Sequence, residues 1–218
     1  MNRDKAAGWA LIAGVVMSLV TMANHPTGHD LLGDNGARQA RLSMMVHVLA
    51  LAALPLSLLG AVGLRRRIGS GSDLNTTALI SYALAMVAVM SAAIFSGLVS
   101  TPIAVQLNGA EEAAKPLIRS LLSYSGLLNQ AYAKTYVGFS GTAMALWGAA
   151  MLRTGTFSRA HGWTGAVLGV ATVAFLFSGH MRLDVHGFGA VVLTQGGWLV
   201  ACSVALINAP TPTTTTAQ

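Results

Sequence analysis

Charged residues are scarce in this chain of 218 residues: Asp, Glu, Lys and Arg make up 9% of it, against 54% hydrophobic residues. A soluble globular domain carries about 25% charged residues, so the composition indicates an integral membrane protein. Cysteine is almost absent as well. The single Cys202 excludes a disulfide framework and a zinc site built from cysteines.

Acidic side chains are also few, which leaves a formal net charge of +6. We attribute this charge to membrane topology and expect no nucleic-acid partner. If the N-terminus is cytoplasmic, seven of the 13 basic residues lie on the inner side: Arg3, Lys5, Arg65, Arg66, Arg67, Arg153 and Arg159. The run Arg65–Arg67 ends an apolar segment at a short loop, where positive charge biases orientation most strongly. We therefore expect a bacterial-type inner (plasma) membrane location, with multiple passes and both termini cytoplasmic.

Long apolar segments are the main positive feature of the sequence, and crossing the hydrocarbon core takes roughly 20 residues per helix. Six segments qualify, near residues 7–23, 43–64, 77–100, 131–152, 162–180 and 187–208. We predict an all-α integral membrane protein with a single six-helix transmembrane domain over residues 1–208. The alternative for the first segment is that it is a cleaved signal peptide and not a transmembrane helix. The Pro/Thr segment 209–218 predicts a disordered tail.

The second outer loop, residues 101–130, contains a further helical pattern. Pro116 suits the first turn of a helix, and Leu117, Leu121 and Leu128 form an apolar stripe after it. We predict a short interfacial helix over 116–128, lying near the outer membrane surface or capping the bundle.

Histidines gather at one end of the predicted bundle. Five of the six fall at the outer ends of helices, and only His161 falls on the inner side. Imidazole and carboxylate groups are ligands for zinc and other transition metals. We predict a transition-metal site at the outer, periplasmic end with these candidate ligands: His25, His29, His47, His180, Asp184 and His186.

The first and third hairpins echo each other in sequence. Trp9 precedes His25 by 16 residues and Trp163 precedes His180 by 17, and both returning helices open with Val-His, at His47 and at His186. This echo favours a site built by these two hairpins. Other polar residues are expected to orient the ligands or bind substrate: Asp30, Ser43, Asn129, Gln130, Tyr132 and Lys134.

The expected cofactor is a zinc or copper ion. Nearby methionines such as Met22 suit copper, although methionine is also a routine packing residue. Haem b is the alternative, with His47 and His186 as its axial ligands.

The segment "SMMVH" (43–47) resembles the Ser-xxx-His element of the intramembrane hydrolases that include alkaline ceramidases and adiponectin-receptor-type proteins. Those proteins have seven helices and a late His-xxx-His within one helix. Here the late histidines, His180 and His186, are six residues apart, so we carry over neither the fold nor the reaction.

These patterns together predict a metal-dependent membrane enzyme of hydrolytic or redox type that acts on a small or lipid-like substrate and contacts membrane lipid. A haem-binding membrane redox protein is one alternative. A non-enzymatic accessory subunit or small-solute carrier is the other, and a homo-oligomer or a partner membrane subunit is compatible with all three.

Overall fold

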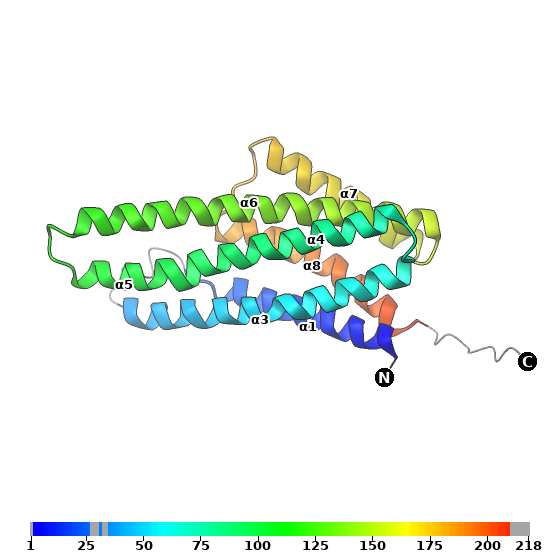
Figure 1. Cartoon of the computed structure of the whole chain (residues 1–218), viewed down its shortest axis with the longest axis horizontal. Coiled ribbons are helices and arrows are strands. Elements are labelled where there is room, and N and C mark those ends of the chain that lie inside the picture. The colour runs from blue at the N-terminus through cyan, green and yellow to red at the C-terminus, as the bar shows by residue number, and fades with distance from the viewer. Residues whose placement is uncertain (1, 27–30, 32–34, 210–218) are drawn as a thin grey trace, which may run out of the picture.

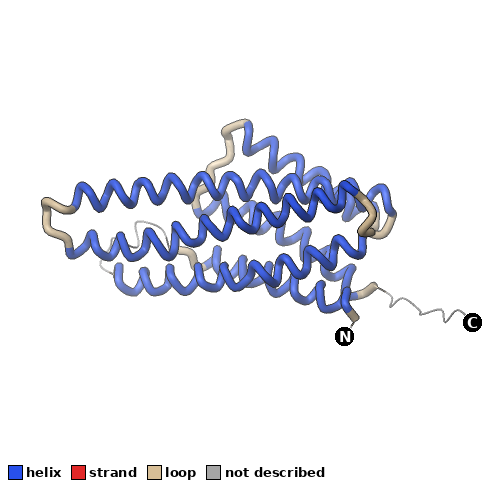
Figure 2. The backbone as a smooth tube through the Cα atoms, in the orientation of Figure 1, coloured by secondary structure: helices blue, strands red, loops and turns tan. Residues whose placement is uncertain are grey.

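The computed structural model describes residues 2–26, 31 and 35–209, which form helices and no strand (Figures 1 and 2). The predicted tail therefore lies, except for Ala209, outside the described residues. The elements are α1 (Arg3–Ala23), α3 (Gly36–Ile68), α4 (Asp73–Ala93), the π-helical η1 (Ile94–Ser100), α5 (Thr101–Gly109), α6 (Lys115–Thr154), α7 (Arg159–Phe177) and α8 (Val185–Ile207).

Two classes of helix length define the shape of the molecule. Helices α1, α7 and α8 have 21, 19 and 23 residues, or about 30 Å each at 1.5 Å per residue, which matches a hydrocarbon core. Helices α3 and α6 have 33 and 40 residues, and α4, η1 and α5 form one continuous helical stretch of 37 residues. Figure 1 shows the long helices extending past the short ones at the end opposite the N-terminus.

Five helical stretches in the described part of the chain are long and apolar enough to cross a membrane, so the predicted count of six is not confirmed. The fourth expected segment, 131–152, lies in α6, which is not among the five. The predicted interfacial helix 116–128 is not a separate element either, because it is the first part of α6. Pro116 lies in the first turn of α6 as predicted, and no later proline interrupts the hydrogen-bond ladder.

Small residues let the helices approach closely. Helix α1 packs on α3 and α8, and α6 lies between α4 and α7. A Cβ built on Gly60 of α3 would meet the Leu11 Cβ at 2.5 Å, and one built on Gly148 of α6 would lie 2.3 Å from the Ala166 backbone nitrogen. Backbones therefore touch at these two interfaces, as is common between membrane helices.

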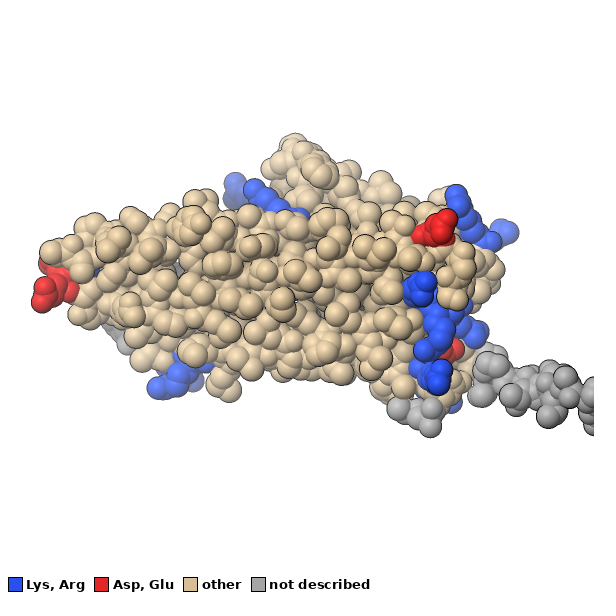
Figure 3. Space-filling view, viewed as in Figure 1, with Lys and Arg blue, Asp and Glu red and all other residues tan. Residues whose placement is uncertain are grey.

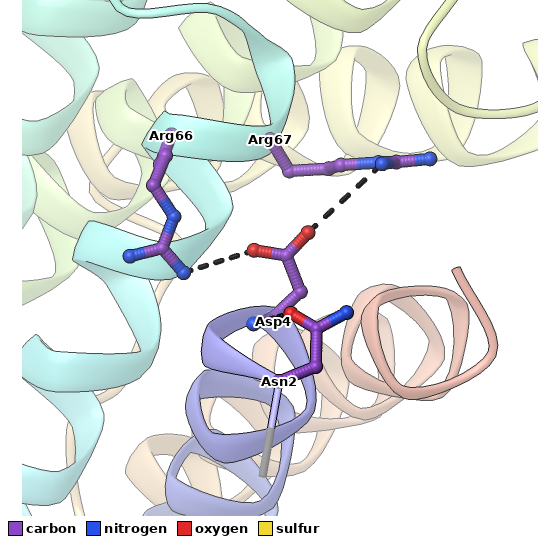
Figure 4. Close-up of polar contacts among 4 residues, drawn as sticks. All are labelled: Asn2, Asp4, Arg66 and Arg67. Carbon is purple, nitrogen blue, oxygen red and sulfur yellow. Dashed lines mark hydrogen bonds and ion pairs between the residues drawn. The ribbon is translucent and has the colours of Figure 1, made fainter. Parts of the chain in front are cut away.

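Charged side chains mark the two ends of the molecule. Figure 3 shows Lys and Arg gathered at the end that holds the N-terminus, beside a broad surface with few charges. At this end Asp4 lies between two arginines, 2.9 Å from Arg66 Nη2 and 3.9 Å from Arg67 Nη1 (Figure 4). The Asn2 side chain accepts a hydrogen bond from the Asp4 backbone N–H and caps α1. These contacts join the start of α1 to the end of α3.

Candidate functional site

A cavity of about 520 Å³ lies between the helices, within the size range of small-molecule binding sites. Its lining residues come from α1, α3, α4, η1, α6, α8 and the segments that flank α1 and α8 at the outer end. Along α3 the lining runs from Ser43 to Ser57, and along α8 from Val185 to Leu199. At a rise of about 1.5 Å per residue, each run covers about 21 Å of helix. The cavity is therefore elongated along the bundle axis.

Much of the cavity wall is apolar, and polar side chains such as Ser18, Thr21 and Ser96 also line it. The apolar part is formed by Ala50, Leu54, Met86, Val89, Ala133, Phe188 and Val192. His25, His47 and His186 line the outer end, while Gln195 and Tyr136 line the inner part. This distribution suits a molecule with an apolar body and a few polar atoms.

The outer end of the cavity brings His25 and His47 together. Their Nε2 atoms are 3.1 Å apart, and the rings meet edge to face with centroids 4.8 Å apart. His25 follows the end of α1 and His47 lies in α3, where it is 3% exposed. The predicted convergence of these two histidines is therefore present in the fold.

Hydrogen bonds to carbonyl groups define the state of both rings. His25 Nδ1 donates to the Pro26 carbonyl oxygen at 2.9 Å, and His47 Nδ1 donates to the Ser43 carbonyl oxygen at 2.6 Å. Because a carbonyl oxygen only accepts, both Nδ1 atoms carry hydrogen, and in neutral rings both Nε2 atoms present lone pairs. The two Nε2 atoms lie 3.1 Å apart, a distance at which they share a proton if one ring is protonated and present two facing lone pairs if both are neutral. Burial lowers the pKa of His25, against the opposing effect of its hydrogen bond to Pro26.

Three contacts fix the surroundings of His47. The Thr21 hydroxyl lies 3.0 Å from the Val46 carbonyl oxygen and so links α1 to α3 beside the pair. Ser43 Oγ and Thr101 Oγ1 are 2.8 Å apart and link α3 to the start of α5. Gly97 of η1 lies against the ring itself, because a Cβ there would be 2.2 Å from His47 Cγ. π-Helical segments occur often at functional sites, and this one leaves space for the imidazole.

Three other predicted ligands, His180, Asp184 and His186, do not join the pair. His180 is exposed in the segment between α7 and α8 and bonds to Ser178. Asp184 caps α8 by accepting from the Gly187 N–H at 2.8 Å, and His186 is exposed at the cavity lining. Over residues 2–26, 31 and 35–209, no three His, Cys, Asp or Glu side chains are close enough to hold one metal ion. The predicted six-ligand cluster is thus not supported.

The predicted supporting residues divide in the same way. Ser43, Asn129 and Gln130 line the cavity, and Gln130 also donates to the Leu183 carbonyl oxygen at 2.9 Å, which ties the segment before α8 to α6. Tyr132 stacks on Phe95 of η1, and Lys134 is exposed. Neither is among the lining residues. His29 and Asp30 lie outside the described residues.

Two cavity residues were missed by the sequence reasoning. Gln195 is 5% exposed, and its Oε1 accepts from the Tyr136 hydroxyl at 3.3 Å. Gln195 lies about half a helical turn away from His186 on α8, so its position does not follow from that of the candidate ligand. The usable signal was the position of a glutamine deep within an apolar span, since such residues usually face a cavity or a partner.

Comparison with known proteins adds no relative: no protein family, curated protein or solved structure matches this chain. The functional argument therefore depends on the site itself.

Proposed function

We propose that this chain is a multi-pass inner-membrane protein that holds one zinc or copper ion between His25 and His47. The ion would lie at the outer end of the cavity and act on a small or lipid-like molecule bound there, in a hydrolytic or redox reaction. The observation that carries the proposal is the approach of the two Nε2 atoms to 3.1 Å, with both Nδ1 atoms bonded to carbonyl oxygens.

Facing lone pairs repel unless a proton or a metal ion lies between them. A shared proton gives an ordinary N–H···N hydrogen bond at 3.1 Å, and a metal ion needs a spacing only slightly longer. Two nitrogens bound to one tetrahedral ion, at about 2.0–2.1 Å each, lie about 3.4 Å apart. Nitrogens on opposite sides of an ion lie about 4 Å apart, which is further from the observed 3.1 Å. The spacing therefore favours a tetrahedral zinc or copper site over two axial haem ligands.

The bonds from Nδ1 to the backbone are the arrangement that orients metal-binding histidines. Such outer contacts fix the tautomer and raise the basicity of the other ring nitrogen. With two protein ligands from the described residues, the remaining coordination positions are available to water and to the bound molecule. An ion with open positions is typical of catalytic and not of structural sites.

Elemental analysis of the purified protein tests the proposal. The chain is purified in detergent without a chelator or a metal-affinity column, and we expect about one zinc or copper ion per chain. His47→Ala and His25→Gln should each lose at least nine-tenths of it while remaining monodisperse. His161→Ala and His180→Ala are the matched controls and should keep it. A metal-free wild type, or equal metal in all variants, would overturn the proposal.

A further inference from the structure

We infer that the end of the bundle that holds the N-terminus carries a binding site for one anionic phospholipid, and that Arg66 and Arg67 bind the phosphate of its head group. The site lies where the start of α1 meets the end of α3. It is at the opposite end of these helices from the His25–His47 pair, and it does not depend on the proposed metal ion.

Arg66 and Arg67 meet a single carboxylate, which leaves positive charge at the site. Asp4 Oδ1 accepts a hydrogen bond from Arg66 Nη2 at 2.9 Å, and Asp4 Oδ2 lies 3.9 Å from Arg67 Nη1 (Figure 4). A guanidinium group carries several N–H donors in a planar fork, and Asp4 engages one nitrogen of each fork. Two guanidinium groups with one carboxylate keep an excess of positive charge, so the cluster is suited to a second anion.

The surrounding residues add to this excess of positive charge. Residues 1–9 and 65–73 contain five basic residues and only two acidic ones, Asp4 and Asp73. Arg65 bonds through Nη2 to neutral groups, a carbonyl oxygen and a hydroxyl, so these contacts do not offset its charge. The five basic residues are Arg3, Lys5, Arg65, Arg66 and Arg67.

Close packing of α1 on α3 fixes the position of the cluster. A Cβ built on Gly63 would collide with the Ala7 Cβ, so the two helices touch there. Gly63 lies three residues before Arg66, and Ala7 lies three residues after Asp4. The ion pair is therefore about one helical turn from this contact on both helices. The guanidinium groups are positioned before a ligand binds, which lowers the entropic cost of binding.

An apolar strip on α3, formed by Leu59 and Val62, leads along the helix surface to these arginines. Leu59 and Val62 are 56% and 46% exposed and precede Arg66 by seven and four residues, so all three lie on one helix face. The Arg66 side chain is itself 42% exposed. Trp9, near the start of α1, is also exposed, and tryptophan is enriched at the level of lipid head groups. An acyl chain that lies along the apolar strip brings its phosphate to Arg66.

The chemistry of the cluster selects a phosphate head group. Guanidinium groups bind phosphate oxygens through paired, charge-assisted hydrogen bonds, and basic pockets between membrane helices bind the head groups of anionic lipids. The neighbouring apolar strip favours a lipid over a free anion, because inorganic phosphate has no apolar part to bury against it. Phosphatidylglycerol, a singly charged phosphodiester, is therefore a suitable probe.

Native mass spectrometry measures how many lipids bind and how tightly. The full chain is purified in a neutral detergent, stripped of lipid and titrated with dioleoyl phosphatidylglycerol or with dioleoyl phosphatidylcholine, which has the same acyl chains. We expect the first phosphatidylglycerol to bind roughly ten-fold more tightly than the first phosphatidylcholine, because each basic residue near an anionic lipid strengthens binding several-fold. Equal affinity for the two lipids would overturn the inference. Displacement of phosphatidylglycerol by millimolar inorganic phosphate would indicate a free-anion site and would overturn it as well.

Two double variants distinguish a local site from a general effect of charge. Arg66→Gln with Arg67→Gln removes two positive charges at the cluster, and Arg38→Gln with Arg41→Gln removes two exposed charges from the other end of the same helix. We expect the first pair to reduce the affinity for phosphatidylglycerol to that for phosphatidylcholine, and the second pair to leave the preference unchanged. An equal loss in both would mean that net charge alone attracts the lipid, contrary to the inference.

Asp4→Asn separates lipid binding from a purely structural ion pair. This variant keeps both arginines and removes the carboxylate that competes for them, so we expect several-fold tighter binding of phosphatidylglycerol. The Asn2 cap of α1 is retained, because it uses the backbone N–H of residue 4. Unchanged or weaker binding would show that the ion pair serves only to join α1 to α3, and would overturn the inference even if the Arg66 and Arg67 double variant did not fold.

Discussion

At the scale of single residues, His47 occupies space that exists because residue 97 is a glycine. A Cβ at position 97 would lie 2.2 Å from His47 Cγ and 2.5 Å from Nδ1. Gly97→Ala must therefore displace the ring and its bond to the Ser43 carbonyl. Outer contacts of this kind are typically worth 10–100-fold in metal affinity, so we expect a loss of about that size, measured by titrating zinc into the metal-free protein.

Gly197→Ala is the matched control for this prediction. Gly197 also lies in a helix, but no side chain or neighbouring helix lies within 4 Å of a Cβ built there. This variant should bind zinc as the wild type does. If Gly97→Ala bound zinc with unchanged affinity, the tight packing of η1 against His47 would have no role in the site.

At the scale of helices, the contact between α6 and α7 depends on glycine at the crossing points. A Cβ on Gly148 would lie 2.3 Å from the Ala166 nitrogen and 2.6 Å from the Gly162 carbonyl oxygen, both of which are backbone atoms that cannot rotate away. Gly148→Ala should therefore push α7 outward and lower the free energy of unfolding by about 1–3 kcal/mol. Denaturant titration in detergent micelles measures this difference.

Gly138→Ala offers the same change on the same helix. There the nearest atom to a new Cβ is Leu176 Cδ2 at 3.5 Å, an ordinary contact, so this variant should match the wild type or exceed it slightly. If both variants lowered the free energy of unfolding equally, the loss would come from helix propensity or the denatured state and not from close packing with α7.

Helices were predictable from the sequence, whereas their continuity and partners were not. Apolar length alone placed the cores of α1, α3, α4, α7 and α8, because hydrocarbon thickness imposes it. The same rule placed a boundary near residue 130, although the hydrogen-bond ladder of α6 continues through it. Backbone hydrogen bonding, and not hydrophobicity, decides where a helix ends.

The site was predictable only in part, for a related reason. His25 and His47 stood out as histidines at helix ends, and α1 packs on α3 as neighbours in a hairpin do. Their partnership depends on the carbonyl groups of Pro26 and Ser43, which no side-chain pattern reveals. The hydrogen bond between Tyr136 and Gln195 joins α6 to α8 through tertiary packing, and no local period of the sequence encodes that pairing.

At the scale of the whole molecule, charge and helix length distinguish the same two ends of the bundle. The last turn of α3, with Arg65–Arg67, lies at the end that holds the N-terminus. The turn between α5 and α6, with Glu111 and Glu112, lies at the far end of the long helices (Figures 1 and 3). Basic loops remain in the cytoplasm during membrane insertion. The extended end, which lies beyond His25 and His47, should therefore face the periplasm.

Cysteine labelling tests this orientation directly. Cys202 is buried and is replaced by alanine, and single cysteines are then placed at two exposed positions, Glu112→Cys in the turn before α6 and Gly71→Cys in the turn after α3. A membrane-impermeant maleimide should label Glu112→Cys in intact spheroplasts and should label Gly71→Cys only after lysis. The reverse pattern would place the histidine pair at the cytoplasmic end, and its cavity would then exchange molecules with the cytoplasm instead of the periplasm.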